Sequence, residues 1–273
     1  MKTWQRAVKR GAIILGNVLI AAIIGGIVNV TLALIGDDSG LTEMRAYTVE
    51  QTESIDSLNL EINAAELVIQ TGESFAVESN IKKFTVNTKN NTLVLLETTK
   101  YTSCGEITYS GKNTPKISLT IPADKHFKNV NITTGAGKFT LQQLSADRLS
   151  FSLGAGEVVI DNLYVTQMAE IEGGAGKITV KNGAMKNMSF DMGVGELSLQ
   201  TQLLGNCELN CGVGEVNVVL LGEKESYQVT VSKGLGNATI DGQKVNTQMT
   251  VGTGENRFNT TGGIGSLTIQ FKE

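Results

Sequence analysis

The sequence contains few of the residues that usually carry catalysis or nucleic-acid binding. Aromatic residues make up only 5% of the 273 residues, which disfavours a sugar-binding surface built from stacked rings. The net charge is −4 and no basic run occurs outside the N-terminus, so nucleic acid is not expected as a partner. The single histidine, His126, has no evident nucleophile partner, and no Gly-x-Ser-x-Gly motif is present. We therefore expect a protein that is not an enzyme and that has no catalytic residues, no metal and no other cofactor.

Cysteine is also scarce, and three residues do not make a disulfide framework. Cys207 and Cys211 fall on the same inward face of one expected strand. Their Cα atoms are then separated by about 13 Å, too far for a bond. Both are expected to be small buried core residues. A metal site that also used Cys104 is disfavoured because His126 is far away in sequence. A redox role for any of the three thiols is left open.

Proline is rarer still, with two residues, whereas the 31 glycines suit an all-β repeat with many corners. The phrase Gly-x-Gly-x-apolar-x-apolar begins at Gly135 and returns four times, at spacings of 19, 20, 19 and 19 residues. Two looser copies follow, and a degenerate copy, Asn63-Ala-Ala-Glu-Leu-Val-Ile69, lies upstream. A fixed period near 20 residues indicates a solenoid, in which each unit buries its apolar face by stacking on its neighbours. The glycine pairs expected at the corners of the units are Gly135 and Gly137, Gly154 and Gly156, Gly174 and Gly176, Gly193 and Gly195, Gly212 and Gly214, Gly234 and Gly236, and Gly263 and Gly265.

Apolar residues alternate with other residues on both sides of each glycine pair. In one copy, Leu149, Phe151 and Leu153 precede the pair, and Val158 and Ile160 follow it. This period of two predicts two strands that each bury one face. The residue between the two glycines is also apolar and is expected to face inward, which requires the backbone to shift by one residue at a glycine corner. Each unit is therefore predicted to be a strand, a Gly-x-Gly corner, a second strand and a return turn.

The predicted fold is an all-β, single-chain β-solenoid with rungs of about 19–20 residues and two main strands per rung. We expect it to be right-handed, because crossovers between parallel strands usually are. The solenoid covers residues 54–273. Within it, residues 54–126 contain the degenerate first rung and capping or flanking strands, and residues 127–273 contain the regular rungs, with an insertion at Asp241–Glu255 before the last.

The first 53 residues differ from the rest of the chain. Residues 1–10 carry Lys and Arg but no acid, and residues 11–36 then run without a charge. A helix of that length spans about 39 Å, more than the ~30 Å hydrocarbon core of a bilayer. Residues 11–36 are therefore predicted to be a transmembrane helix, and residues 37–53 a polar stalk.

The positive-inside rule places residues 1–10 in the cytoplasm and everything after Asp37 outside it. A cleaved signal peptide is the rival interpretation. It is disfavoured because the apolar run is long and no small-x-small cleavage site is evident before the acidic flank.

One outward position of the repeat carries charge. The residue after the second glycine is Lys138, Glu157, Lys177, Glu196 and Glu215 in successive copies. Stacked rungs place such residues about 4.8 Å apart, so that opposite charges are mostly neighbours. The simpler interpretation is a solvated ladder that fixes the register of the rungs. The functional alternative is a mixed-charge stripe that binds an envelope polymer or a peptide.

The repeat phrase is similar to that of a bacterial family known as putative adhesins. Its members typically carry repeated Ser-Thr-Gly-Ala-Gly-Asp-apolar phrases, and the counterparts here include Thr134-Gly135-Ala136-Gly137. The resemblance covers roughly residues 54–273 and implies a membrane-anchored β-solenoid, often linked to envelope stress systems. The usual acid after the second glycine is Lys138 or Lys177 in two copies here, which argues against a uniform acidic, metal-binding stripe.

These observations predict a single-pass protein of the cell membrane whose C-terminal domain is extracytoplasmic. The membrane is its partner through residues 11–36, and a cell-wall polymer, a peptide or an envelope protein is the further partner. The expected function is non-enzymatic: adhesion, binding or scaffolding in the cell envelope. Two alternatives stay open. One is a polysaccharide-active β-helix enzyme, and the other is a structural protein that self-associates through the ends of the solenoid.

Overall fold

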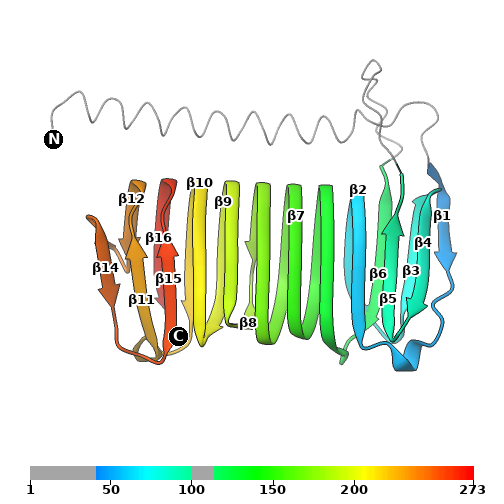
Figure 1. Ribbon diagram of the computed structural model, residues 1–273, viewed down its shortest axis with the longest axis horizontal. Helices are drawn as coiled ribbons and strands as arrows, with labels where there is room; N and C mark the ends of the chain where they lie inside the picture. The colour runs from blue at the N-terminus through cyan, green and yellow to red at the C-terminus, as the bar shows by residue number, and fades with distance from the viewer. Residues whose placement is uncertain (1–40, 100–113) are drawn as a thin grey trace, which may run out of the picture.

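The structure is a computed structural model that describes residues 41–99 and 114–273 (Figure 1). Most of these residues lie in strands, so the predicted all-β class is confirmed. In chain order the strands are β1 (Leu41–Tyr47), β2 (Ser57–Gly72), β3 (Ala76–Ile81), β4 (Phe84–Lys89), β5 (Thr92–Glu97), β6 (Lys116–Pro122), β7 (His126–Val180), β8 (Gly183–Lys186), β9 (Met188–Leu204), β10 (Asn206–Leu221), β11 (Tyr227–Ser232), β12 (Leu235–Ile240), β13 (Gln243–Lys244), β14 (Gln248–Val251), β15 (Asn256–Thr261) and β16 (Ile264–Lys272).

Helix is confined, within these two ranges, to the 3-10 turns η1 (Thr52–Ser54) and η2 (Lys224–Ser226). Neither is long enough to cross a bilayer. The helix predicted at residues 11–36 lies outside the described residues, as do residues 1–10 and Cys104.

Successive turns of the chain pair in parallel and in register. Ala175 pairs with Val194 and Val194 with Val213, and the residues that follow continue these ladders one to one. Figure 1 shows the result as a row of tall, narrow rungs between β2 and β12. Alternate side chains of each strand are buried in one continuous apolar core. This stack of parallel rungs agrees with the predicted β-solenoid, whose right-handed winding stays a prediction.

Some rungs contain a third, short strand that was not predicted. β8 pairs in parallel with Leu163–Val165 of β7 on one side and with Gln202–Leu204 of β9 on the other. Its Met185 is fully buried. The return turn of these rungs therefore also contributes to the core. A strand of three or four residues is too short to show a period in the sequence, which is why the prediction has two strands per rung.

At one end of the stack, the order of the rungs in space differs from their order in the chain. β15 and β16 come last in sequence, yet each pairs with β10 on one side. On the other side β15 pairs with β11 and β16 with β12. Gly265 accordingly lies between Gly214 and Gly236. The expected insertion, Asp241–Glu255, contributes β13 and β14, which run antiparallel to the outer rung.

The other end of the stack is built in a similar way. β2 pairs with β7 on one side and with β5 and β6 on the other, although β7 follows all of them in the chain. β4 and β3 run antiparallel to β5 and β6, and β1 is antiparallel to β3. Antiparallel strands thus border the parallel stack at both ends.

β1 corrects the predicted stalk. Residues 41–47 form an edge strand in which Leu41 pairs with Ile81 and Tyr47 with Val77. An edge strand at the end of a stack buries little of its surface, so its sequence lacks the apolar alternation of the inner strands. Within β1, Leu41 and Tyr47 pack against the core, and the Tyr47 ring lies edge-on to that of Phe84 with centroids 5.2 Å apart. Residues 37–40 alone then separate the charge-free segment 11–36 from the first strand.

Candidate functional site: the glycine corners and the surfaces beside them

The glycine pairs lie where each rung passes from its first main strand to its second. The second glycine of the pair has a φ between 132° and 148° in six rungs, a conformation that residues with side chains rarely adopt. These six are Gly137, Gly156, Gly176, Gly195, Gly214 and Gly265. The remaining predicted corner glycines are needed for a different reason, because a Cβ on any of them would collide with a carbonyl oxygen of the adjacent rung. They are Gly135, Gly154, Gly174, Gly193, Gly212, Gly234, Gly236 and Gly263.

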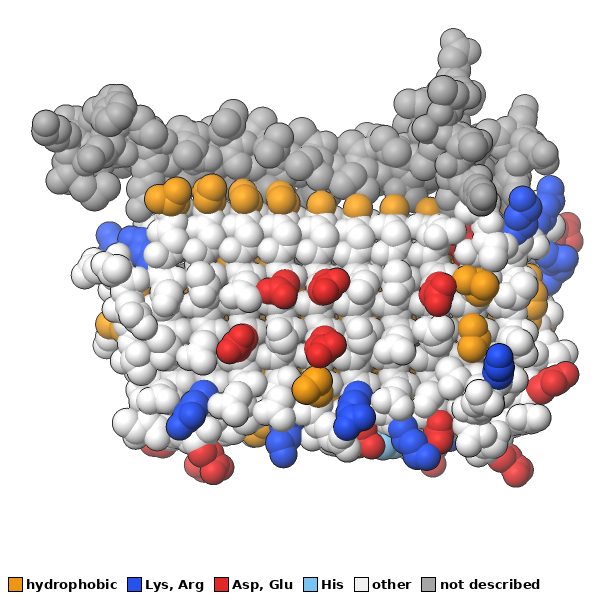
Figure 2. Space-filling model, in the orientation of Figure 1, with side chains coloured by type: hydrophobic (Ala, Val, Ile, Leu, Met, Phe, Trp, Pro, Cys, Tyr) orange, Lys and Arg blue, Asp and Glu red, His pale blue; other side chains and the backbone are white. Residues whose placement is uncertain are grey.

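The apolar residues between the glycines form a stacked row, which we call the corner ridge. Its members, in spatial order, are Ala64, Ala136, Ala155, Ala175, Val194, Val213, Ile264 and Leu235. Figure 2 shows a line of hydrophobic side chains along the corresponding upper edge of the molecule. Leu235 is 69% exposed, and Ala64 alone of the eight belongs to the buried core. The predicted inward orientation is therefore wrong for the seven others. The chain reverses direction at the corner, so the apex side chain points away from the interior.

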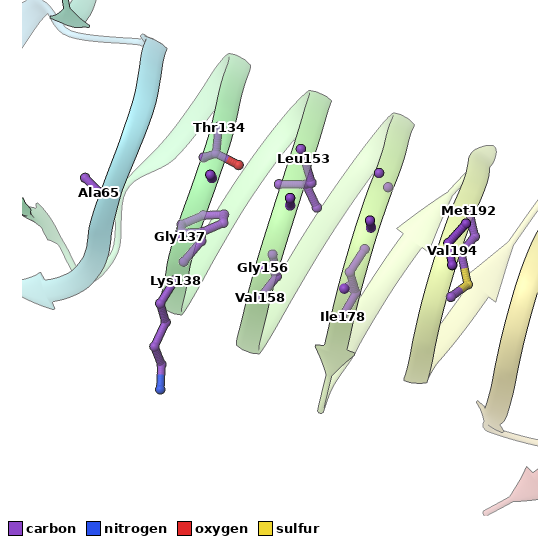
Figure 3. A pocket seen from close by; sticks show the side chains of 18 residues that line it. Ala65, Thr134, Gly137, Lys138, Leu153, Gly156, Val158, Ile178, Met192 and Val194 are labelled. Carbon is purple, nitrogen blue, oxygen red and sulfur yellow. The ribbon is translucent and has the colours of Figure 1, made fainter. Parts of the chain in front are cut away.

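A small cavity lies beneath the corner ridge (Figure 3). Phe139, Leu153, Val158 and Ile178 line it from within the core, together with the glycine backbone of several rungs. Its volume of about 20 Å³ is enough for one water molecule. The cavity follows from the sequence, because two glycines in each rung leave no side-chain atoms to fill the space inside the corner. It is too small for a substrate.

The degenerate corner is completed by Glu97, a residue that sequence reasoning missed. The carboxylate of Glu97 is 3% exposed and accepts hydrogen bonds from the backbone N–H groups of Asn63 at 2.8 Å and Ala64 at 3.1 Å. The Asn63 side chain donates in turn to the carbonyl oxygens of Glu97 and Thr99. On the side away from β7, β2 pairs with the separate strands β5 and β6, and neither of these strands contains a Gly-x-Gly phrase. The carboxylate therefore satisfies corner N–H groups that face no neighbouring corner.

The predicted charge ladder lies on the outward side of the second main strands. Lys138 Nζ is 3.2 Å from Glu157 Oε2, and Lys177 Nζ is 3.3 Å from Glu196 Oε2. Glu215 stands in register with Glu196 and accepts a hydrogen bond from Asn217 instead. All four paired side chains are about half exposed, so each ion pair contributes at most about 1 kcal/mol.

Two further charged residues extend the ladder and were not predicted. Glu66 is in register with Lys138, and Lys116 Nζ is 3.6 Å from Glu66 Oε2. Glu66 occupies the ladder position of the degenerate phrase, and that signal could have revealed it. Charges of alternating sign in a solvated row stabilise the register of the rungs, and they also form a polar surface of defined spacing.

His126 has partners that the sequence did not reveal. Its Nδ1 is 2.8 Å from Ser145 Oγ, and its Nε2 is 3.0 Å from Asp147 Oδ1, which also accepts a hydrogen bond from Thr166. The Thr166 hydrogen bond and then His126 hold the pKa of Asp147 below its usual range. The expectation that His126 has no nucleophile partner is therefore wrong. The group is open to water, with His126 44% and Asp147 33% exposed, and it does not line the cavity beneath the ridge. Nothing in this arrangement supplies the desolvated cleft that acyl transfer needs.

The other titratable groups of interest are structural. Cys207 is fully buried and Cys211 half-buried, and both are free thiols whose pKa is raised by burial. Cys207 Sγ lies 3.4 Å from the Leu204 carbonyl oxygen. Within residues 41–99 and 114–273, no group of three His, Cys, Asp or Glu side chains is placed to hold a metal ion.

The rungs, the glycine corners and the ladder together define a repeat protein of the β-solenoid type. Residues 45–263 match the family model described as Toastrack DUF4097, and the chain belongs to this family. The resemblance seen in the glycine phrase is thereby confirmed. A search of the curated proteins finds no match to the chain.

Several solved structures resemble the chain at low sequence identity. A putative adhesin from Parabacteroides distasonis is 12% identical with a TM-score of 0.47, over 85% of this chain and 98% of that one. A putative adhesin from Bacteroides fragilis is 15% identical with a TM-score of 0.42, over 83% and 95% of the two chains. A protein from Parabacteroides distasonis described as a putative lipid binding protein is 13% identical with a TM-score of 0.35, over 84% and 97%. The family membership rests on the sequence match.

Proposed function

We propose that the chain is a membrane-anchored, non-enzymatic module of the bacterial cell envelope that binds a partner or holds it in place. In this proposal residues 11–36 span the membrane once, residues 1–10 are cytoplasmic, and the stacked rungs are extracytoplasmic. The charge-free length of residues 11–36 and the basic residues before them support the anchor. Membership of the Toastrack family and its resemblance to putative adhesins support a binding role.

The observation that carries the proposal is the pair of broad, polar faces on the stack. Each main strand contributes one outward row per rung, and Figure 2 shows polar and acidic side chains spread over one of these faces without a hollow. On the first main strands, the outward residues Glu172 and Asp191 are in register, and Asp191 accepts a 2.7 Å hydrogen bond from Asn210. A flat array of evenly spaced polar groups suits an extended partner such as a polymer or a peptide, whereas catalysis needs convergent groups in a cleft.

The same geometry weighs against the two alternatives. For a polysaccharide-active enzyme, the acids of the described faces lie along flat rows, and the cavity beneath the ridge is too small for a sugar. For a self-associating solenoid, the ends would have to expose a parallel rung. Antiparallel strands border much of these ends, β1 at one and β13 and β14 at the other, although β13 pairs with β12 only at Thr239 and Ile240. β1 includes Glu43 and Arg45, which blunt an edge against further pairing.

The proposal is tested with the full-length, affinity-tagged protein cross-linked in living cells and recovered from their envelopes. Bound material is analysed for protein, lipid and glycan, and a tagged chain of residues 1–40 serves as the control for the anchor. We expect one class of molecule to be enriched over this control. No enrichment of any class, from protein whose circular dichroism shows the strands intact, would refute a binding role.

Two charge-reversal variants then locate the surface. One changes the ladder (Lys138→Glu with Lys177→Glu), and its matched counterpart changes the opposite face (Glu170→Lys with Glu172→Lys). All four side chains are outward and partly or fully exposed, so neither variant disturbs the core. The partner should be lost from one variant and retained by the other. Loss from both or from neither would exclude a single polar face as the binding surface.

A further inference from the structure

The corner ridge is a long apolar line that the polar faces do not explain. Its eight positions are stacked at the spacing of neighbouring strands, which gives a length of about 33 Å. The side chains grow from Ala175 through Val194 and Val213 to Ile264 and Leu235, and the last of these is 69% exposed. A continuous apolar row on the outside of a protein marks a contact surface.

The chain enters the described structure at the level of this ridge. Leu41 of β1 pairs with Ile81 of β3. Two residues before Ile81, Ser79 pairs with Ile117 of β6. Ile117 in turn pairs with Leu67 of β2. Leu41 is therefore level with Ala65, which lies two residues before Leu67 on β2 and next to Ala64, the first residue of the ridge. Figure 1 agrees, because β1 begins at the upper edge, where the rungs have their corners. The N-terminal end of β1 therefore lies at the ridge edge of the stack.

The connection to the anchor is short. β1 begins within the predicted stalk, so that residues 37–40 remain between the segment 11–36 and Leu41. Five peptide steps span at most about 18 Å. A stack tethered so closely cannot stand far from the bilayer, and the edge from which the tether leaves is the edge nearest to it. The tether also keeps the ridge at a high effective concentration beside the lipid, so that weak contacts suffice.

Basic side chains lie at both ends of the ridge, whereas acids such as Glu172 and Asp191 lie beside it on the polar faces. Lys82 and Lys83 follow Ile81 at one end of the ridge and are exposed, and Lys233 precedes Gly234 at the other. Such side chains place their stems along apolar surface and their charges among headgroups. The opposite edge carries ion pairs at the far ends of the strands, including Lys181 with Asp161 at 2.7 Å, and Figure 2 shows charged side chains gathered there.

We propose that the corner ridge lies on the lipid surface of the membrane to which the chain is anchored, so that the rungs stand upright with their polar faces perpendicular to the bilayer. The inference rests on the proposed anchor and adds the orientation of the domain. The ridge side chains contact the headgroup and upper acyl region, while the corner glycines keep the backbone low enough for the side chains of all rungs to reach it. Partners then approach the faces along the membrane plane.

The test uses tryptophan fluorescence of the full chain in vesicles of phosphatidylcholine and phosphatidylglycerol, with or without bromine atoms on the upper acyl chain. Trp4 is the sole tryptophan, so Trp4→Phe provides a silent background. Leu235→Trp and Val213→Trp report from the ridge. Met168→Trp is the matched control, because Met168 is an exposed apolar residue at 45% that precedes Ala175 by seven residues, about 23 Å along the strand.

We expect brominated lipid to quench both ridge reporters about twofold and to leave the Met168 position almost unchanged. Flotation of the same vesicles separates the two proposals. A chain that does not float with the vesicles would overturn the anchor and the ridge contact together. A chain that floats while its ridge reporters are no more quenched than the control would leave the anchor standing and overturn the ridge contact. Blue-shifted but unquenched ridge reporters would also overturn it, and would point to residues 11–36 or a second copy as the cover.

Discussion

The most specific prediction concerns Gly195, one of the corner glycines. In Gly195→Ala the new Cβ meets two obstacles. The backbone φ of 143° is one that side chains rarely adopt, and the Cβ would collide with the carbonyl oxygen of Gly176 in the adjacent rung. Ser198, three residues further along the same strand, has an exposed outward side chain and meets neither obstacle. The two substitutions add or remove similar numbers of atoms, so their difference isolates the corner.

The expected magnitude follows from these two contributions. A side chain held in a glycine-only backbone region costs about 1–3 kcal/mol. Relieving the collision must displace the neighbouring rung and weaken one or two ladder hydrogen bonds, each worth about 0.5–1.5 kcal/mol. We therefore expect Gly195→Ala to lower the unfolding free energy by about 2–5 kcal/mol, and the melting temperature by roughly 4–15 °C. Ser198→Ala should stay within about 0.5 kcal/mol of the parent protein.

Two further glycines separate the two contributions. Gly242 has a φ of 77° and no atom within 4 Å of the place a Cβ would take, so Gly242→Ala reports the cost of a left-handed backbone without a collision. Gly236 has no such φ but meets the Gly265 carbonyl oxygen, so Gly236→Ala reports the collision alone. Thermal unfolding followed by circular dichroism of the full-length protein in detergent ranks the four variants. If Gly195→Ala were no more destabilising than Gly242→Ala, the argument from close backbone approach would be wrong.

Three other results are expected. Glu97→Gln should lower the unfolding free energy by about 1–3 kcal/mol in urea titrations, because a buried carboxylate accepts two backbone N–H groups at the degenerate corner. Lys177→Gln should change it by at most about 1 kcal/mol, since Lys177 and Glu196 are half exposed, and the change should shrink as salt is added. The hydrogen bond from Lys128 holds the pKa of Asp56 below its usual 3.8. Asp56 therefore stabilises the fold above that pH, and its advantage over Asp56→Asn should vanish as the pH falls through the lowered pKa.

Each of these has an outcome that would contradict it. Unchanged urea midpoints for Glu97→Gln would show that the corner N–H groups find another acceptor. A loss well above 1 kcal/mol for Lys177→Gln, independent of salt, would show that the ladder is more than a solvated surface feature. A stability difference between the parent and Asp56→Asn that persists unchanged from pH 7 to below pH 3 would exclude the carboxylate charge as its cause.

The regular part of the fold could be predicted because the same sequence pattern recurs in each rung. The glycine phrase and the alternation around Phe151 and Val158 recur with one period, so the register of neighbouring rungs and the pairing of Lys138 with Glu157 follow from spacing alone. The same reasoning failed where a residue's surroundings come from outside its own repeat. Glu97 completes a corner more than thirty positions away in sequence, and Ser145 and Asp147 reach His126 from the next turn of the chain.

Orientation at the corners was predicted wrongly for a local reason. Alternation correctly assigns Leu153 and Val158 to the interior, but it does not show on which side of the apex the backbone shifts. A residue such as Val213 is apolar and in phase with one neighbouring strand, and it therefore looks like core. Its exposure follows from the reversal of the chain at the apex. The residues of the corner ridge, the surface proposed to contact lipid, thus have the same apolar pattern in the sequence as core residues.

The position of β15 and β16 within the stack has a consequence for how the protein is made. Synthesis proceeds from β10 to β11 and β12 before β15 and β16 exist, yet the completed stack holds the later pair between the earlier ones. If β11 and β12 docked on β10 during synthesis, they would therefore occupy the positions that β15 and β16 take in the completed stack, and they would have to leave again. Assembly of this end must wait until residue 272 has emerged, whereas the turns from β7 to β10 can be added one after another as they appear. The outer rung and its antiparallel border therefore reach their final places only with or after the docking of β15 and β16 on β10.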